Sequence, residues 1–448
     1  MFNLIFIKMR KRNLFYALAA GMVLFCACSN DADIINEGNN SLNEEVQQLV
    51  LQVASSGDGL QTRAGRPLLS SEAKQDFKNL KVLVCKKSDG SIVADTLLTD
   101  WNTSSQEYTK GGQGKEKAIV LSGHNKLAAG EQFVVYAFGF DEESEYKDAT
   151  GNTSIKELLA TYGNGKAETE DAANKETVNT YNGNLILNGK GEEIFAGSVE
   201  FTVPSEANQG FNQSVVLHRQ VAGVFTYIKD IPYLEGAVRL QLYAVTESDR
   251  LVLGNFLNSE LEQNGGNVSS NVVNGFASST KNETLVTEEL LSDWFTEPAK
   301  NKDGLIDATN GNWKGDSQKF AGGSVFMGEF LNPFQKGSTT TFVLKLVKNN
   351  NDELRSWAIK LPTKDKATSL TAWDSGENKF APVSSYTETE NNYSVLRNHL
   401  YGVGTRTDDN PENPGTNPDD KPESLNNKQE LTLRVNDNWE VIHNMEIE

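Results

Sequence analysis

Apolar and polar residues alternate with a period of two through much of the chain, which is typical of half-buried strands. The alternation predicts strands over residues 46–54, 80–86, 132–140, 193–203, 214–228, 237–245, 339–347, 353–361 and 395–403. Residues 349–352 predict the turn of a hairpin, and the Asn- and Gly-rich residues 255–282 predict a surface loop. Helical spacing of apolar residues predicts one short helix over residues 155–162. The pattern as a whole predicts a mainly β fold.

The end of the chain repeats this alternation behind a proline-rich segment, Asp408 to Glu423. Four of the eleven prolines fall between Pro411 and Pro422, a density that is typical of a stiff spacer. Two short strand patterns follow, and one face of them carries Leu431, Leu433, Val435, Trp439, Val441, His443, Met445 and Ile447. A hairpin alone is marginally stable in water, so this face needs another surface to cover it. On a tether, these strands are predicted to pair with a neighbouring molecule.

The N-terminus has the pattern of a secretion signal. Basic residues from Lys8 to Arg12 precede the apolar stretch Leu14–Phe25, which is too short for a comfortable membrane span. Either Met1 or Met9 can serve as the start. Ala27 followed by Cys28 resembles a bacterial lipobox, in which Cys28 receives lipid and anchors the protein to a membrane. Ordinary signal cleavage beside incidental cysteines is the alternative interpretation.

The strand pattern nearest the signal leads into a loop that contains two arginines. Leu49, Leu51 and Val53 share one face of this strand, and the loop Ser55–Arg66 contains Arg63 and Arg66. Exposed, glycine-containing segments of this kind are preferred sites of proteolysis. The alternative is a plain loop with two solvated arginines.

Size, charge and cysteine content narrow the classes of protein. The 448 residues are enough for two or three domains, and the net charge of −19 argues against a nucleic-acid-binding protein. Beyond the signal the one cysteine is Cys85, which predicts a buried thiol without a disulfide partner.

Motifs for catalysis and metal binding do not emerge from the sequence. The four histidines, His124, His218, His399 and His443, lack metal-ligand spacing. The run Gly111–Lys115 ends in Glu116, where a phosphate-binding loop needs Ser or Thr. At EF-hand spacing, residues 299–310 lack the required carboxylates, which leaves an irregular calcium site as the alternative. Trp101, Trp294 and Trp313 are predicted to pack in the core rather than to bind sugars. We therefore expect no catalytic residue, metal or cofactor.

An ordered set of motifs resembles the Bacteroidetes fimbrillins, the type V pilus subunits that include the Porphyromonas major and minor fimbrillins. The set comprises the lipobox at Cys28, the stretch Thr62-Arg63-Ala64-Gly65, the stretch 217–223 (Leu-His-Arg-Gln-Val-Ala-Gly), the stretch 395–403 (Val-Leu-Arg-Asn-His-Leu-Tyr-Gly-Val) and the closing strand with Trp439-Glu440-Val441. The resemblance runs along the whole chain as order and spacing rather than as close identity.

This resemblance implies a domain plan of tandem β-sandwiches of transthyretin-like, Greek-key type. The plan assigns residues 1–27 to the signal, 28–63 to a propeptide, 64–213 and 214–407 to two sandwich domains, and 408–448 to the linker and donor strands. It implies that an arginine-specific protease cuts between Arg63 and Ala64, or at Arg66, and releases the strand with Leu49, Leu51 and Val53. The donor strands of another copy or of a related fimbrial subunit then fill the vacated slot. The precursor is expected at the outer membrane through its lipid, and the mature protein in an extracellular adhesive fimbrium whose receptor is unknown.

Three alternatives to a stalk subunit stay open. The chain could be a surface lipoprotein that binds glycans without polymerising, with its tail folded back on its own body, or an anchor or tip subunit. A secreted glycosidase would require a pair of carboxylates that the sequence cannot identify.

Overall fold

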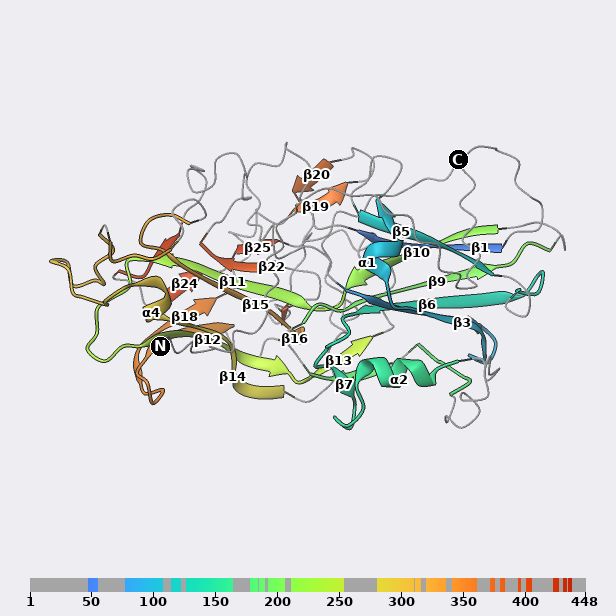
Figure 1. Cartoon of the computed structure of the whole chain (residues 1–448), viewed down its shortest axis with the longest axis horizontal. Helices are drawn as coiled ribbons and strands as arrows, with labels where there is room; N and C mark the ends of the chain where they lie inside the picture. Colours follow the sequence, from blue (N-terminus) through green and yellow to red (C-terminus); the bar gives the residue numbers. More distant parts are fainter. Residues whose placement is uncertain are drawn as a thin grey trace, which may run out of the picture. The chain divides into compact units, whose positions relative to one another are not determined.

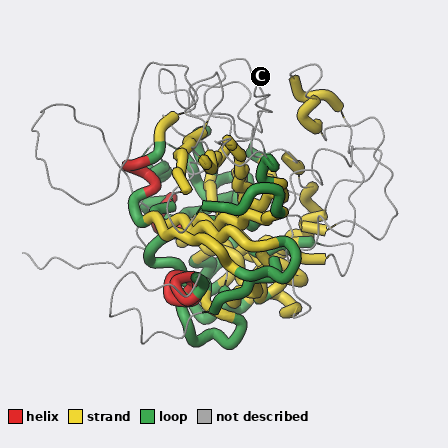
Figure 2. Tube along the Cα trace, turned by 90° about the vertical axis from the view of Figure 1, so that its right-hand side faces the viewer, coloured by secondary structure: helices red, strands yellow, loops and turns green. Residues whose placement is uncertain are grey.

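A computed structural model describes residues 47–54, 77–107, 114–121, 126–163, 178–183, 185–189, 192–205, 211–253, 280–309, 311–315, 320–335, 341–360, 371–374, 379–382, 394–395, 400–404, 422–426, 430–432 and 434–436. All of them belong to one unit that spans residues 43–448. Strands predominate in both views (Figures 1 and 2), and the helices of the described part are the short α1 (Trp101–Ser104), α2 (Ile155–Thr161) and α4 (Leu291–Trp294). The prediction of a mainly β fold is confirmed.

The first half of the chain forms an eight-stranded sheet. Its order is β3-β2-β6-β9-β10-β1-β5-β4. The strands are β1 (Gln47–Ala54), β2 (Asn79–Lys86), β3 (Ile92–Leu98), β4 (Gln106–Glu107), β5 (Gly114–Leu121), β6 (Gln132–Phe140), β9 (Phe195–Thr202) and β10 (Phe211–Arg219). Strand β10 joins the two parts of this sheet, because it pairs with β1 along most of its length and with β9 at His218 and Arg219.

Two groups of buried side chains lie on opposite faces of β2 and β6. The N-terminal core takes Val82 and Val84 from β2 together with side chains of β1, β5, β6, β9 and β10. The lateral core takes Leu83 and Cys85 from β2 together with side chains of β6, α2, β8 (Leu185–Asn188) and β13 (Arg250–Leu253). Neighbouring residues of a strand point to opposite faces, so a strand that is apolar throughout can contribute to two cores.

The predicted helix is present as α2 and begins at a capping box. Ser154 accepts a hydrogen bond from the Glu157 N–H on its Oγ (3.2 Å), and the Glu157 carboxylate accepts one from the Ser154 N–H (3.3 Å). This reciprocal pair satisfies backbone donors that a helix N-terminus otherwise leaves unpaired. Ile155 and Leu159 then point into the lateral core, which explains the apolar spacing. Beside α2, the short β7 (Lys147–Asp148) pairs with β8, and β8 pairs with β13.

The second half of the chain contributes two five-stranded sheets. One has the order β14-β12-β17-β18-β24, and the other contains β15-β11-β22-β25 with β23 also paired to β11. Their strands are β11 (Ala222–Lys229), β12 (Arg239–Ser248), β14 (Thr280–Leu290), β15 (Val325–Leu331), β17 (Phe342–Val347), β18 (Glu353–Lys360), β22 (Leu400–Val403), β23 (Glu423–Ser424), β24 (Glu430–Thr432) and β25 (Arg434–Asn436). Buried residues of both sheets form a single cluster, the C-terminal core.

Three pairs of antiparallel strands complete the described part of the chain. Strands β17 and β18 pair antiparallel across residues 348–352, where Asn351 has a φ of 66°, so the predicted hairpin is confirmed. Strand β16 (Phe334–Gln335) pairs with β21 (Ser394–Val395), and β19 (Thr371–Asp374) pairs with β20 (Lys379–Pro382). The predicted strand 395–403 is described only at its ends, as β21 and β22.

The junction between the two halves differs from the sequence-based plan. The expected boundary between residues 213 and 214 falls inside β10, and the single strand predicted over residues 214–228 is two strands, β10 and β11. Gln220, fully buried between them, donates its backbone N–H to the Ile194 carbonyl (2.8 Å). Strand β13 also returns from the second half to pair with β8. Apolar residues flank the polar stretch His218-Arg219-Gln220 on both sides, so the pattern alone did not locate the break.

Polar groups at this junction are buried and paired. The Arg219 guanidinium, fully buried, contacts the Glu193 carboxylate (Nη2 to Oε1, 2.6 Å). Asn332 accepts a hydrogen bond from the Tyr146 hydroxyl (2.7 Å) and donates to the Gly189 carbonyl (2.7 Å) and the Ser248 carbonyl (3.0 Å). Buried polar groups that are satisfied in this way fix one arrangement of the segments they join.

Candidate functional site

Strand β1 occupies an interior position of the first sheet, although it is the first described segment of the chain (Figure 1). It pairs parallel with β10 over Gln47–Val53 and antiparallel with β5 over Gln47–Ala54. Both edges of the strand are therefore hydrogen-bonded to neighbours.

The side chains of β1 fill part of the N-terminal core. Leu49 and Leu51 are fully buried there, and Val215 and Leu217 of β10 belong to the same cluster. Two of the three residues predicted to share an inward face thus do so, while the side chain of Val53 lies outside the described residues. Fully burying a leucine contributes about 1.5–3 kcal/mol, so β1 is a stabilising part of this core.

Without β1, a slot would lie between β5 and β10. The backbone N–H and C=O groups that now pair with β1 would face that slot from both sides, as would the apolar side chains of Leu121, Val215 and Leu217. Unpaired strand edges of this kind are templates for another strand. Such a slot would match an extended segment with apolar residues at every second position, as β1 itself has. We call it the β1 slot.

The sequence around the slot predicted β1 and missed its partner β5. Residues 114–121 contain Lys115, Glu116 and Lys117 in a row, which obscures the apolar positions Ile119 and Leu121 that pack into the N-terminal core. The short apolar run Ala118–Leu121 was the local signal of a strand. Strand β10 was predicted only as the first part of a longer strand.

The beginning of the predicted donor tail is paired with its own body. Strand β23 runs parallel to the end of β11, β24 runs parallel to β18, and β25 runs antiparallel to β22. Leu425 is fully buried and Leu431 is 2% exposed, both in the C-terminal core. The Leu425 N–H donates to the Lys229 carbonyl (3.0 Å). We call residues 422–436 the tail anchor.

This arrangement corrects the view of residues 431–435 as part of a free donor strand. Leu431 belongs to β24 and Val435 to β25, two strands on two different sheets, with the undescribed Leu433 between them. Alternation in a sequence shows that a strand has one apolar face; it does not show whose core that face completes. The other five predicted donor positions, Trp439, Val441, His443, Met445 and Ile447, lie outside the described residues.

The residues predicted to be lipidated or cut also lie outside the described part. Cys28, Arg63, Ala64 and Arg66 are among them, as are the signal segment and the proline-rich segment up to Lys421. The described chain resumes at Phe77 after β1. Of the histidines, His218 lies in β10, while His124, His399 and His443 are not described.

The three tryptophans that were considered as sugar-binding residues pack against the cores. Trp101 is buried in the N-terminal core, and Trp294 and Trp313 pack half-buried against the C-terminal core, which confirms the prediction for these tryptophans. Among the residues that the structure describes, no cluster of His, Cys, Asp and Glu could hold a metal ion. No helix in the described ranges is long and apolar enough to cross a membrane.

Cys85 is buried in the lateral core, as predicted, and its surroundings suppress ionisation. Burial raises the pKa of the Cys85 thiol from 9.0 to about 12. The neutral thiol is the unreactive form. Because the folded pKa exceeds the unfolded one, burial of the neutral thiol stabilises the fold fully below about pH 9, and this contribution is lost as the pH rises toward 12.

We expect Cys85 to react with Ellman's reagent only after unfolding. A pKa of about 12 in place of 9.0 lowers the thiolate fraction at pH 8 by about a thousandfold. The measurement compares the labelling rate at pH 8 in buffer and in urea, with Cys26 and Cys28 replaced by serine so that the signal comes from Cys85. Equal rates under the two conditions would contradict a buried thiol.

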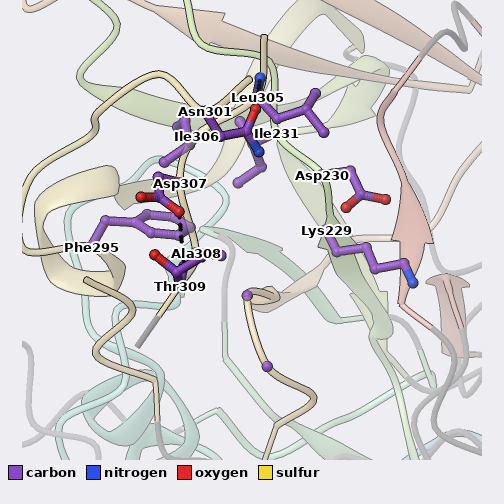
Figure 3. Close-up of a pocket in the computed structure, with 12 residues that line it drawn as sticks. Lys229, Asp230, Ile231, Phe295, Asn301, Leu305, Ile306, Asp307, Ala308 and Thr309 are labelled. Atoms are coloured by element: carbon purple, nitrogen blue, oxygen red, sulfur yellow. Dashed lines mark hydrogen bonds between the residues drawn. The ribbon is translucent and has the colours of Figure 1, made fainter. Parts of the chain in front are cut away.

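One hollow of about 270 Å³ lies beside the end of β11. Figure 3 shows Asp307 and Phe295 on one side of it and Lys229 and Asp230 on the other. Asn301 Oδ1 accepts hydrogen bonds from the N–H groups of Asp303 and Leu305, each at 2.9 Å. The Asp307 carboxylate accepts one from the Thr309 N–H (3.0 Å). These side chains accept hydrogen bonds from backbone N–H groups of the loop that resembled a calcium site in the sequence. In the described geometry their role is therefore to hold the shape of the loop.

Comparisons with known proteins give matches among solved structures alone. No protein-family model matches the chain, and no curated protein matches it. It is similar to a fimbrial assembly protein from Parabacteroides distasonis (11% identity, 81% of this chain and 91% of that chain, TM-score 0.35). It is also similar to the fimbrial anchor protein Mfa2 from Porphyromonas gingivalis (9%, 80% and 90%, 0.32). A third match is the tip fimbrial protein Mfa3 from the same organism, with a C-terminal truncation (11%, 80% and 94%, 0.34).

Proposed function

We propose that the chain is a structural subunit of a cell-surface fimbria that is exported as a lipoprotein and polymerises by exchange of strands. The observation that carries the proposal is the interior place of β1, with partners on both sides and buried leucines. Its link to the rest of the chain runs through the segment that contains Arg63 and Arg66. One cut there separates an interior strand from the body.

The proposed order of events follows from this placement. Lipidation at Cys28 brings the precursor to the outer membrane. At this stage β1 occupies its slot and prevents polymerisation before the cut. An arginine-specific protease cuts between Arg63 and Ala64, with Arg66 as the alternative site, and β1 leaves. The open slot exposes strand edges and apolar side chains, so it is stable only when another strand fills it.

We assign the donated strand to the end of the tail, after the tail anchor. Leu425 and Leu431 are buried in the body that carries them, which supports a fixed starting point for the donor. The remaining residues, 437–448, carry Trp439, Val441, His443, Met445 and Ile447 at every second position. This spacing suits a slot whose resident strand places Leu49 and Leu51 inward. The polymer then repeats one contact, from the tail of one copy to the slot of the next.

The proposal also includes two tandem sandwich domains and a place in the stalk of the fimbria. Two separate buried clusters, the N-terminal and C-terminal cores, support two sandwich domains joined near Gln220. A cleavable segment after β1 and a tail together favour a stalk subunit, because such a subunit needs both an acceptor and a donor. An adhesive role for the fimbria follows from its surface location, with the receptor unknown.

Mass spectrometry of the protein extracted from the cell surface tests the proposal. A mature N-terminus at Ala64, together with a ladder of SDS-resistant oligomers, is the expected result. An N-terminus at Pro67 would move the cut to Arg66 without changing the mechanism. A lipidated Cys28 terminus with monomer alone would contradict polymerisation.

A second candidate is a surface lipoprotein that binds glycans and remains a monomer. The pairing of β24 and β25 with the chain's own sheets favours it, because a tail that folds back is what this candidate requires. It differs from the first in one respect that is easily measured: cutting at Arg63 would leave its state of association unchanged. An anchor subunit would be expected to keep β1, and a tip subunit would be expected to lack a donor tail.

A further inference from the structure

Gln47, the first residue of β1, pairs its side chain with the main chain of Leu127. The Gln47 carboxamide donates from Nε2 to the Leu127 carbonyl (3.0 Å) and accepts from the Leu127 N–H on Oε1 (2.7 Å). The side chain thus pairs with one main-chain residue in both directions, as a neighbouring strand would. Of the natural side chains, only Asn and Gln place a neutral donor and a neutral acceptor on one planar amide group.

Leu127 lies on the connection from β5 to β6, at the end of the β1 slot. Its side chain is buried in the N-terminal core, so its main chain is held close to the end of β1. After β1 leaves, the N–H and C=O of Leu127 lose these hydrogen bonds together. A buried or half-buried main-chain group without a partner is unfavourable, so the slot has a polar requirement as well as an apolar one.

We propose that the Leu127 main chain is a polar selector at the end of the β1 slot, and that the Gln47 carboxamide satisfies it and fixes the register of the resident strand. The proposal rests on the strand exchange proposed above. The position that reads the Leu127 main chain is two residues before the first buried apolar residue, as Gln47 stands before Leu49. In the proposed donor this position is Asp437, before Trp439, and its carboxylate would accept from the Leu127 N–H without donating to the Leu127 carbonyl, so the resident strand fits this end of the slot better than the donor does.

A shift of register shows why one position is decisive. Moving the strand by two residues keeps Leu49 or Leu51 on the inward face, because side chains alternate with a period of two. The apolar positions alone therefore tolerate such a slip. The Gln47 carboxamide does not tolerate it, because the Leu127 main chain is at one place only. The contact carries no net charge, so it is expected to be insensitive to pH and salt.

The test uses the full-length chain after a cut with an arginine-specific protease. Native mass spectrometry follows how long the fragment that contains β1 stays bound to the body. We expect Gln47→Leu to speed release at least tenfold. Gln48→Leu is the matched control, because residue 48 is the neighbouring glutamine on the opposite face of β1 and should change release less than twofold. Gln47→Glu keeps the acceptor and loses the neutral donor, and is expected to lie between them.

A second measurement applies if a variant is cut poorly. Hydrogen exchange of the uncut chain should show faster exchange of the β1 amides and of the Leu127 amide in Gln47→Leu than in Gln48→Leu. Synthetic peptides of residues 43–54 should compete for the slot of the cut chain. The peptide with the natural sequence should compete best, the Gln48→Leu peptide next and the Gln47→Leu peptide least. Equal release, exchange and competition for Gln47→Leu and Gln48→Leu would overturn the selector.

These outcomes separate the selector from the proposed function. If the fragment leaves faster in Gln47→Leu and yet no oligomer forms from any cut chain, the selector holds and polymerisation fails. If oligomers form normally and the two leucine variants behave alike, polymerisation holds and the selector fails.

Discussion

Replacing Arg63 and Arg66 together with alanine is expected to leave the protein as a monomer that carries its β1 strand. The uncut strand keeps both of its ladders, to β10 and to β5, and Leu49 and Leu51 stay in the N-terminal core. The slot is then occupied covalently, and an incoming strand must compete with a segment whose effective concentration is in the millimolar range. We expect the SDS-resistant ladder to fall below about one per cent of the unmodified protein, the level that a hundredfold preference gives.

The single variants locate the cut and provide the controls. Arg63→Lys keeps the charge and removes the side chain that an arginine-specific protease reads, and Arg66→Lys does the same at the alternative site. The variant that loses the ladder identifies the cut. A normal ladder from the double alanine variant, with the intact N-terminal segment still present by mass spectrometry, would contradict release of β1 as the opening step.

Ending the chain after Asn436 is expected to abolish the polymer while the monomer stays folded. The truncation removes Trp439, Val441, His443, Met445 and Ile447 and leaves the tail anchor in place. Ending the chain after Lys421 also removes Leu425 and Leu431 from the C-terminal core. Loss of two buried leucines costs about 3–6 kcal/mol, so the chain that ends at Lys421 should unfold at a temperature lower by roughly 6–24 degrees. Thermal unfolding of the two uncut proteins measures the difference.

Mixing the variants tests the direction of the exchange. The double alanine variant offers a tail with a filled slot, and the cut protein that ends at Asn436 offers an open slot without a tail. Together they should form a dimer and nothing longer, while each alone stays monomeric. A ladder from the chain that ends at Asn436 would show that the strands of the tail are not the donor, and a normal unfolding temperature for the chain that ends at Lys421 would contradict the tail anchor.

The sequence was informative where a segment has one buried face and one solvent-exposed face. The alternation over residues 46–54 predicted β1 and its inward leucines, and the hairpin of β17 and β18 followed from alternation around an Asn-rich turn. The apolar spacing over residues 155–162 predicted α2, whose Ile155 and Leu159 are buried. In each case the local signal and the tertiary environment agree, because every second or every third to fourth residue meets the core.

The same patterns were insufficient where a strand is buried on both faces or where the chain crosses between sheets. The break between β10 and β11 was not located from the sequence, because Arg219 and Gln220 are buried although they are polar, and apolar residues flank them on both sides. Gly402 illustrates a related limit: a Cβ there would collide with the Phe225 ring, a constraint between residues far apart in sequence. The return of β13 to β8 depends equally on distant partners.

The sequence by itself determined the mainly β character of this protein, the strand that precedes the two arginines and the alternating tail. It did so because alternation of apolar and polar residues shows that a segment has one face suited to burial. Only the tertiary structure decided that β1 is interior, that Gln47 reaches Leu127, and that Leu425 and Leu431 complete the body that carries them. The physical reason is that pairing and burial join residues far apart in the chain, and a local pattern does not record which of many apolar surfaces will cover a given face.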